Sequence, residues 1–128
     1  SVAGYVAAPG LVKVVEVPFD YTTPSVDSGI VVPNGAVVTR VTVDVLVDFD
    51  GGPGTDTLGI IIASIPTPET IMTTAQNDLT LPGQYTVNVI TPLTDNGVVR
   101  VELTLGAAPA PTQGNGIAYI FYSDAPEI

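Results

Sequence analysis

The longest run of alternating apolar and polar residues is Val37–Phe49, which reads VVTRVTVDVLVDF. Every second residue, counted from Val37, is apolar or threonine, and the positions between include Arg40, Asp44 and Asp48. Successive side chains of a strand point to opposite faces, so this pattern predicts a long strand with one apolar and one largely solvated face. Valine is stiff at χ1 and fits a strand better than a helix. One-sided alternation is typical of antiparallel sheets, and we expect this strand to lie at the centre of one.

Similar runs recur along the chain between turn signals. The first is Leu11–Tyr21, in which Pro18 lies on the polar side. Because proline cannot donate to a ladder, we expect this strand to be an edge there or to carry a bulge. Alternation predicts a shared apolar face made of Val15, Val17, Phe19 and Tyr21. The further predicted strands are Val26–Val32, Thr57–Ser64, Tyr85–Thr91, Val99–Leu105 and Ile117–Tyr122.

Two of these runs flank a turn signal, Asp95-Asn96-Gly97. Asn-Gly is the preferred centre of a tight hairpin, so we expect Tyr85–Thr91 and Val99–Leu105 to pair with each other. The segment 66–78 allows two interpretations: a short helical turn opened by Pro68, or a short strand around Ile71.

Strand Thr57–Ser64 is nearly apolar on both faces. Such a run suggests burial on both sides, by the core on one side and by a subunit contact on the other. With about eight strand candidates and no convincing helix, the chain is predicted to be all-β. Connections of uneven length favour an antiparallel β-sandwich of the jelly-roll type over an up-and-down barrel. We expect residues 11–128 to form this single domain, with 1–10 as an N-terminal arm or a frayed tail.

Charge is scarce and one-sided. Charged residues make up 12% of the chain, and the formal net charge is −10 with three basic residues. This excludes a Lys/Arg footprint for nucleic acid or for an anionic membrane. The low charged fraction indicates either a surface of Thr, Ser, Asn and Gly or a surface covered by other chains, and the apolar arm favours an oligomer. Arg40 and Arg100 are expected to pair with carboxylates within the chain or across an interface.

The chain lacks the usual reactive side chains. It contains no His and no Cys, so catalytic triads and imidazole or thiolate metal sites are excluded. Asp44 and Asp48 lie about 13 Å apart along a strand, too far for a paired catalytic function. The prediction is that the chain is not an enzyme and takes no cofactor.

A glycine-rich segment, Asp50–Asp56, contains a second group of carboxylates. Asp48, Asp50 and Asp56 flank its glycines, and oxygen ligands on a flexible loop suit Ca²⁺. The EF-hand spacing is absent, and the other interpretation is a solvated turn. The five tyrosines allow a similar choice between a sugar-stacking platform and core packing.

The order of strands and turns resembles small virion proteins of tailed phages. The resemblance runs through KVVEVPFDYTTPS, GIVVPNGAVVTRVTVDVLVDFDG, NDLTLPGQYTVNV and GNGIAYIFYSD, which cover most of residues 11–123. Its marks are the turn Pro33–Ala36, the strand start Gly83–Tyr85 and the last strand Gly116–Tyr122. They form a pattern of turns and strands with no catalytic signature.

This resemblance implies a capsid decoration (cement) protein. Such a protein would be made in the host cytoplasm, would form a homotrimer on the outer capsid surface and would clamp neighbouring major capsid subunits. The alternative is a receptor- or carbohydrate-binding module of a phage fibre or tail, with recognition in the loops Asp50–Asp56 and Gly106–Gly116. For the capsid role we expect contacts through Val2, Tyr5, Val6, Leu46, Leu58, Ile60 and Ile62.

Overall fold

The computed structural model describes residues 12–23, 25–52, 54–64 and 68–123. In these residues it has eight strands and one single-turn 3₁₀ helix, and no helix in them has the length and apolar character needed to cross a membrane. The elements are β1 (Val12–Asp20), β2 (Val26–Val32), β3 (Val37–Val47), β4 (Thr57–Ser64), β5 (Glu69–Met72), η1 (Thr74–Gln76), β6 (Gly83–Pro92), β7 (Gly97–Thr104) and β8 (Asn115–Ser123).

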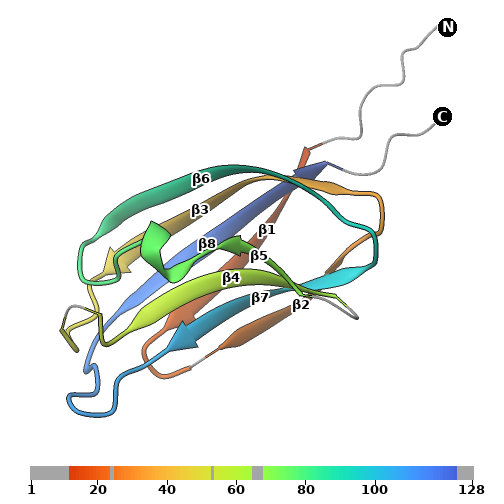
Figure 1. The fold of residues 1–128 in the computed structure, drawn as a ribbon. Coiled ribbons are helices and arrows are strands. Elements are labelled where there is room, and N and C mark those ends of the chain that lie inside the picture. Colours follow the sequence, from red (N-terminus) through yellow and green to blue (C-terminus); the bar gives the residue numbers. More distant parts are fainter. Residues whose placement is uncertain (1–11, 24, 53, 65–67, 124–128) are drawn as a thin grey trace, which may run out of the picture.

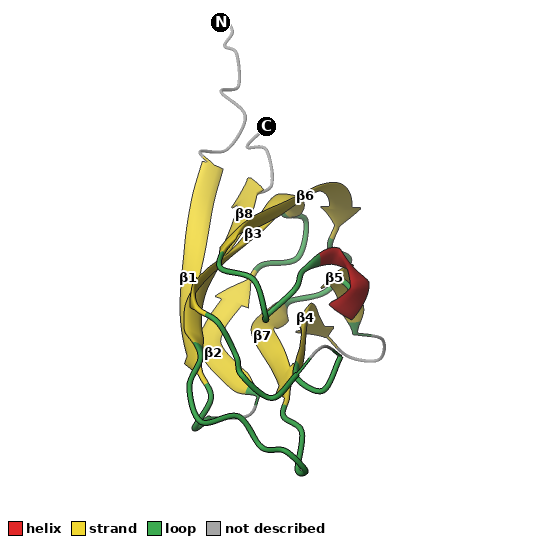
Figure 2. Ribbon diagram, turned by 90° about the vertical axis from the view of Figure 1, so that its left-hand side faces the viewer, coloured by secondary structure: helices red, strands yellow, loops and turns green. Residues whose placement is uncertain are grey.

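The strands form two antiparallel four-stranded sheets packed face to face (Figures 1 and 2). The first sheet has the order β1-β8-β3-β6, and the second has the order β2-β7-β4-β5. Most chain connections pass from one sheet to the other, so strands that are neighbours in a sheet are distant in sequence. This is the jelly-roll arrangement, and it confirms the predicted all-β sandwich.

The core lies between the two sheets. Alternate valines of β3, namely Val41, Val43 and Val45, face it and are buried. From the opposite sheet, β4 and β7 contribute their own inward rows. The fully buried members of those rows include Leu58, Ile60, Ile62, Val99, Val101 and Leu103. As predicted, β3 is an interior strand, paired with β8 on one side and β6 on the other.

Two bulges interrupt the alternation of β3. Its pairing shifts between Val38 and Arg40, and again between Val45 and Val47. An extra residue changes which face the following side chains occupy. Val38 is therefore buried and Val47 exposed, whereas strict alternation predicted the reverse. The sequence pattern alone carries no mark of either bulge.

The predicted hairpin between Tyr85–Thr91 and Val99–Leu105 is wrong. These runs correspond to β6 and β7, which lie in different sheets. The connection between them is anchored by Leu93, which is buried and exchanges backbone hydrogen bonds of 2.9 Å with Gly35 and Ala36. Because this leucine is buried, the chain crosses the end of the sandwich from one sheet to the other. Asn96-Gly97 therefore lies in a connection between the two sheets and not in a hairpin.

Three smaller expectations are resolved. β5 is a strand with Ile71 buried, as one interpretation of segment 66–78 predicted, and the helical turn of this segment, η1, follows it instead of being opened by Pro68. Among the described strands β1 pairs only with β8, so it is an edge strand, as the proline at position 18 predicted. Tyr21 follows the end of β1 and is exposed instead of facing the core.

Candidate functional site: the loop end and the outer face of the first sheet

The three loop aspartates hold two loops together. The loop after β3 and the loop after β7 lie at the same end of the sandwich (Figure 1). Asp50 accepts hydrogen bonds from the Thr112 backbone N–H, at 2.6 Å, and from the Thr112 hydroxyl. Asp48 accepts one from the Gln113 amide at 3.1 Å, and Asp56 one from a backbone N–H of the second loop at 2.8 Å. Each carboxylate therefore tethers a different residue of the loop between β7 and β8.

These carboxylates do not converge on a common point. Among the described residues, no group of three acidic, His or Cys side chains is placed to hold a metal ion. Asp56 is 4% exposed, and its Oδ2 has no hydrogen-bond partner in the described structure. That oxygen lies against the backbone of Gly51, where a Cβ would come within 2.3 Å of it. The arrangement gives the aspartates a structural role at this end of the molecule.

The tether between Asp50 and Thr112 has a measurable signature. Hydrogen bonds from the Thr112 side chain and backbone lower the pKa of Asp50 below its ordinary 3.8, and bonds from Thr80 lower the pKa of Asp78 in the same way. A lowered pKa contributes stability that is present above 3.8 and is lost as the pH falls through the folded value. We therefore expect the sandwich to lose stability on acidification in the range below 3.8.

Replacement of Thr112 by Val removes the hydroxyl donor and should raise the pKa of Asp50 toward 3.8. The measurement is an NMR titration of the side-chain carboxyl groups, with Asp78 as the internal control, because its pKa should not move. An unchanged pKa of Asp50 in the variant would contradict the tether.

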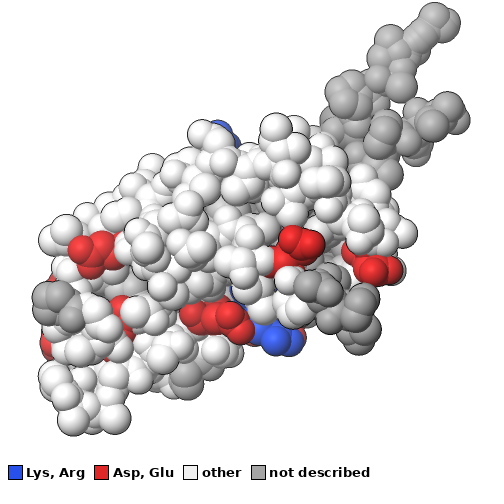
Figure 3. Space-filling view, viewed as in Figure 1, with Lys and Arg blue, Asp and Glu red and all other residues white. Residues whose placement is uncertain are grey.

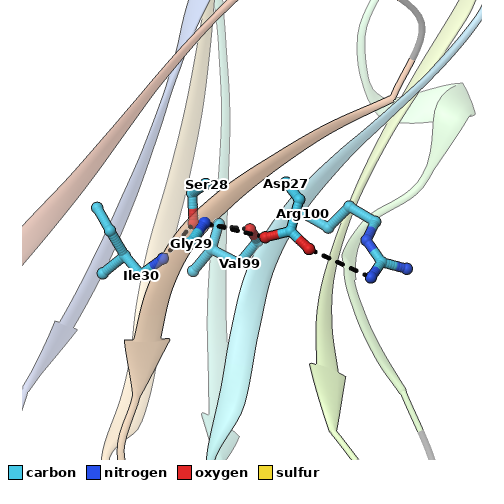
Figure 4. A network of polar contacts seen from close by, with 6 residues as sticks. All are labelled: Asp27, Ser28, Gly29, Ile30, Val99 and Arg100. Atoms are coloured by element: carbon cyan, nitrogen blue, oxygen red, sulfur yellow. Dashed lines mark hydrogen bonds and ion pairs between the residues drawn. The ribbon is translucent and has the colours of Figure 1, made fainter.

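One of the two arginines that were expected to pair with a carboxylate, Arg100, lies on the second sheet. Arg100 on β7 forms an ion pair of 3.4 Å with Asp27 on β2, as expected (Figure 4). Asp27 also accepts a hydrogen bond from the Gly29 N–H, where the pairing of β2 with β7 shifts. Both side chains are partly exposed, so this pair contributes little stability and mainly pins the bulge of β2.

The other arginine lies on the outer face of the first sheet. The Arg40 guanidinium sits 4.1 Å from the centroid of the Phe121 ring, a cation–π contact. Among the described residues no carboxylate lies within ion-pair distance of it. A shallow depression of about 340 Å³ surrounds this contact, and it is lined by Val12, Thr39, Arg40, Asn88 and Phe121.

The register of the first sheet arranges its outward side chains in rows. One row across the four strands is Val14–Phe121–Arg40–Asn88, and the next is Glu16–Tyr119–Thr42–Thr86. A third is Pro18–Ile117–Asp44–Gln84. We call these twelve residues the sheet face. The core instead takes the other side of β8, through Ala118, Ile120 and Tyr122.

The predicted contact residues fall into three groups. Leu46 is 53% exposed at the end of β3, and it remains available for a contact. Leu58, Ile60 and Ile62 are fully buried between the sheets, so they cannot touch a partner and their assignment as contacts is wrong. β4 is apolar on both faces, as the sequence indicated, but these three residues face the core and not the outside. Val2, Tyr5 and Val6 lie outside the described residues and stay predictions.

Several exposed apolar residues were not predicted from the sequence. Ile90 is the clearest, because it is 86% exposed at an outward position of β6. The signal was present in the sequence: Ile90 continues the otherwise polar series Gln84, Thr86 and Asn88. At the other end of the sheet, Val47 and Leu81 are exposed beside Leu46. There a backbone hydrogen bond of 2.8 Å from Phe49 to Leu79 brings the two segments together.

Comparison with known proteins gives a match in structure and none in sequence. The chain matches no protein-family model and no curated protein. Its fold is similar to that of a chain in the acid-stable capsid structure of Helicobacter pylori bacteriophage KHP30, with a TM-score of 0.56 and 19% identity. That match covers 94% of each chain.

Two other phage capsids contain chains of the same fold. In the capsid asymmetric unit of cyanophage Pam1, the TM-score is 0.54 at 23% identity, over 97% of this chain and 96% of the other. In the capsid of Ralstonia phage GP4, it is 0.57 at 19% identity, over 97% and 91%. The jelly roll described here is thus shared, over nearly its whole length, with chains of phage capsids.

Proposed function

We propose that this chain is a virion structural protein of a tailed phage, a decoration protein that binds the outer surface of the capsid. The observation that carries the proposal is the nearly full-length match to chains of three phage capsids. Because the match covers at least 91% of each chain compared, it relates chains of similar length. The resemblance of the strand and turn pattern to small virion proteins supports the same role.

The surface of the molecule is suited to being covered. Figure 3 shows a face that is mostly uncharged, with acidic side chains scattered over it. Exposed apolar side chains occur at both ends of the first sheet, including Leu46, Leu81 and Ile90. Burying such side chains against a neighbour is favourable by about 25 cal/mol per Å² of apolar surface. Contacts of a standard size, ~1,600 Å² each, repeated around the shell would stabilise it additively.

In this proposal the protein acts as a homotrimer that clamps neighbouring major capsid subunits. Leu46 is the contact residue for which exposure and the sequence-level expectation agree. Each trimer carries three equivalent binding surfaces for the capsid, so three weak contacts combine into a strong attachment. Light scattering should therefore give the mass of three chains or a multiple of three, and a stable monomer without affinity for shells would contradict this arrangement.

The functional test is binding to shells that lack the protein. We expect wild-type protein to sediment with such shells and Leu46→Asp to bind at least tenfold more weakly, because a contact would bury an unpaired charge. Thr104→Asp, on the exposed side of β7, is the matched control for adding an acid, and it should bind normally. If wild-type protein stayed in the supernatant but bound glycans, the receptor-binding alternative would replace the decoration role.

A further inference from the structure

The sheet face carries three charged residues whose side chains find no ion-pair partner among the described residues. Arg40 and Asp44 both point outward from β3, on either side of Thr42. Glu16 points outward from β1 in the same row as Thr42. Arg40 and Asp44 are four residues apart along one strand, about 13 Å, so they cannot pair within one molecule. The opposite charges are therefore held apart on a common surface.

We propose that the sheet face binds a second copy of this chain, face to face, around a two-fold axis that crosses the strands along the row of Thr42. Such an axis exchanges the row of Arg40 with the row of Asp44. Arg40 of each copy then lies over Asp44 of the other, which forms two equivalent ion pairs. A two-fold contact is self-complementary by necessity, and this face meets that condition.

The apolar side chains follow the same symmetry. Phe121 lies in the row of Arg40, and Ile117 lies in the row of Asp44, both on β8. The axis places the phenyl ring of one copy over the isoleucine of the other. Tyr119, midway between them, meets its own counterpart at the centre. Tyrosine and arginine are the residues that most often dominate such contacts.

A two-fold axis along the strands does not give this match. It would place the row of Arg40 over the same row of the other copy, so that Arg40 would face Phe121 and each Asp44 would lie opposite Ile117. The charges therefore select one of the two symmetric ways to stack the sheets. Stacked sheets lie about 10 Å apart, a distance that arginine and aspartate side chains span together.

The available area is adequate for a specific contact. Nine residues of β1 and β8 extend over about 30 Å, and four strands are about 19 Å wide. The whole outer face of the first sheet, with the sheet face at its centre, therefore measures roughly 570 Å², or about 1,100 Å² for two copies, close to the lower limit of ~1,000 Å² for a specific interface. The net charge of −10 on each copy opposes association. The two ion pairs between Arg40 and Asp44 therefore have to offset this repulsion locally.

Charge substitution tests the proposal. Arg40→Asp makes both positions acidic, and Asp44→Arg makes both basic, so each variant alone should dimerise at least tenfold more weakly than wild type. An equimolar mixture of the two variants should associate as tightly as wild type, because acidic positions of one meet basic positions of the other. The double variant Arg40→Asp/Asp44→Arg should also recover self-association. The measurement is sedimentation equilibrium at 25 °C over a range of concentrations.

Arg100→Asp and Glu102→Arg make the same changes on β7 of the second sheet, and they should leave association unchanged. Glu16→Gln supplies a test of opposite sign, because the axis brings Glu16 near its own counterpart, and removing that repulsion should tighten the pair. If neither the mixture nor the double variant associates while all variants unfold at wild-type temperatures, the proposal is overturned. Shell binding is a separate readout, so a protein that decorates shells without pairing in this way would refute only this inference.

Discussion

Gly116→Ala is expected to destabilise the sandwich by about 3 kcal/mol, because the substitution forces the backbones of two central strands apart. Gly116 lies on β8, opposite Phe19 of β1 and Val45 of β3. A Cβ at this position would come within 2.3 Å of the backbone carbonyl oxygen of Asp44 and 2.6 Å of the Phe19 ring. The carbonyl belongs to a paired strand and cannot rotate away. The measurement is chemical denaturation of the wild-type protein and of the Gly116→Ala variant.

Gly59→Ala is the matched control, because it also adds a methyl group to a strand. The nearest atom to its Cβ would be the Met72 carbonyl oxygen at 3.4 Å, an ordinary contact. We expect this variant to lose less than ~1 kcal/mol. Equal losses in the two variants would show that the approach of β8 to β3 is not limited by Gly116.

The second large effect is expected at Phe49, just beyond the end of β3. Its side chain is 1% exposed and stacks on Phe19 with ring centroids 6.2 Å apart. Gly114 packs against the Phe49 ring so closely that any Cβ there would overlap it. Phe49→Ala leaves a cavity that these rigid neighbours cannot fill, so we expect a loss of about 3–5 kcal/mol. Thermal and chemical denaturation both measure it.

Leu46→Ala is the companion variant, at a position three residues earlier and within β3. It removes an exposed side chain, so stability should change by less than about 0.5 kcal/mol. Shell binding, in contrast, should weaken in this variant and not in a folded core variant such as Val43→Ala. A large stability loss in Leu46→Ala would mean that Leu46 serves the core and not a contact.

The sequence predicted the fold because period-2 alternation was strong in most of the long strands. In β3 the valines at 41, 43 and 45 face the core as expected, and the Pro18 edge strand follows from one missing N–H. The bulges of β3 were not predictable, since they depend on pairing with β6 and β8. The hairpin assignment failed for a similar reason: Asn96-Gly97 is a local signal, while the course of the chain is decided by the burial of Leu93.

The interaction surface was harder to predict than the fold. Leu58, Ile60 and Ile62 and their neighbour Ile61 look alike in sequence, and only the partner sheet shows which side faces the core. From the sequence, Arg40 was expected to pair with a carboxylate, whereas its stacking on Phe121 depends on the register of β3 with β8. Exposed Ile90 is the residue that a stricter reading of alternation would have found.

The most direct test of the decoration role is an electron-microscopy reconstruction of shells before and after addition of this protein. We expect additional density on the outer surface at every local three-fold position, with the shape of the two-sheet sandwich of Figure 1. Shells that are identical with and without the protein, or density confined to the tail, would contradict it.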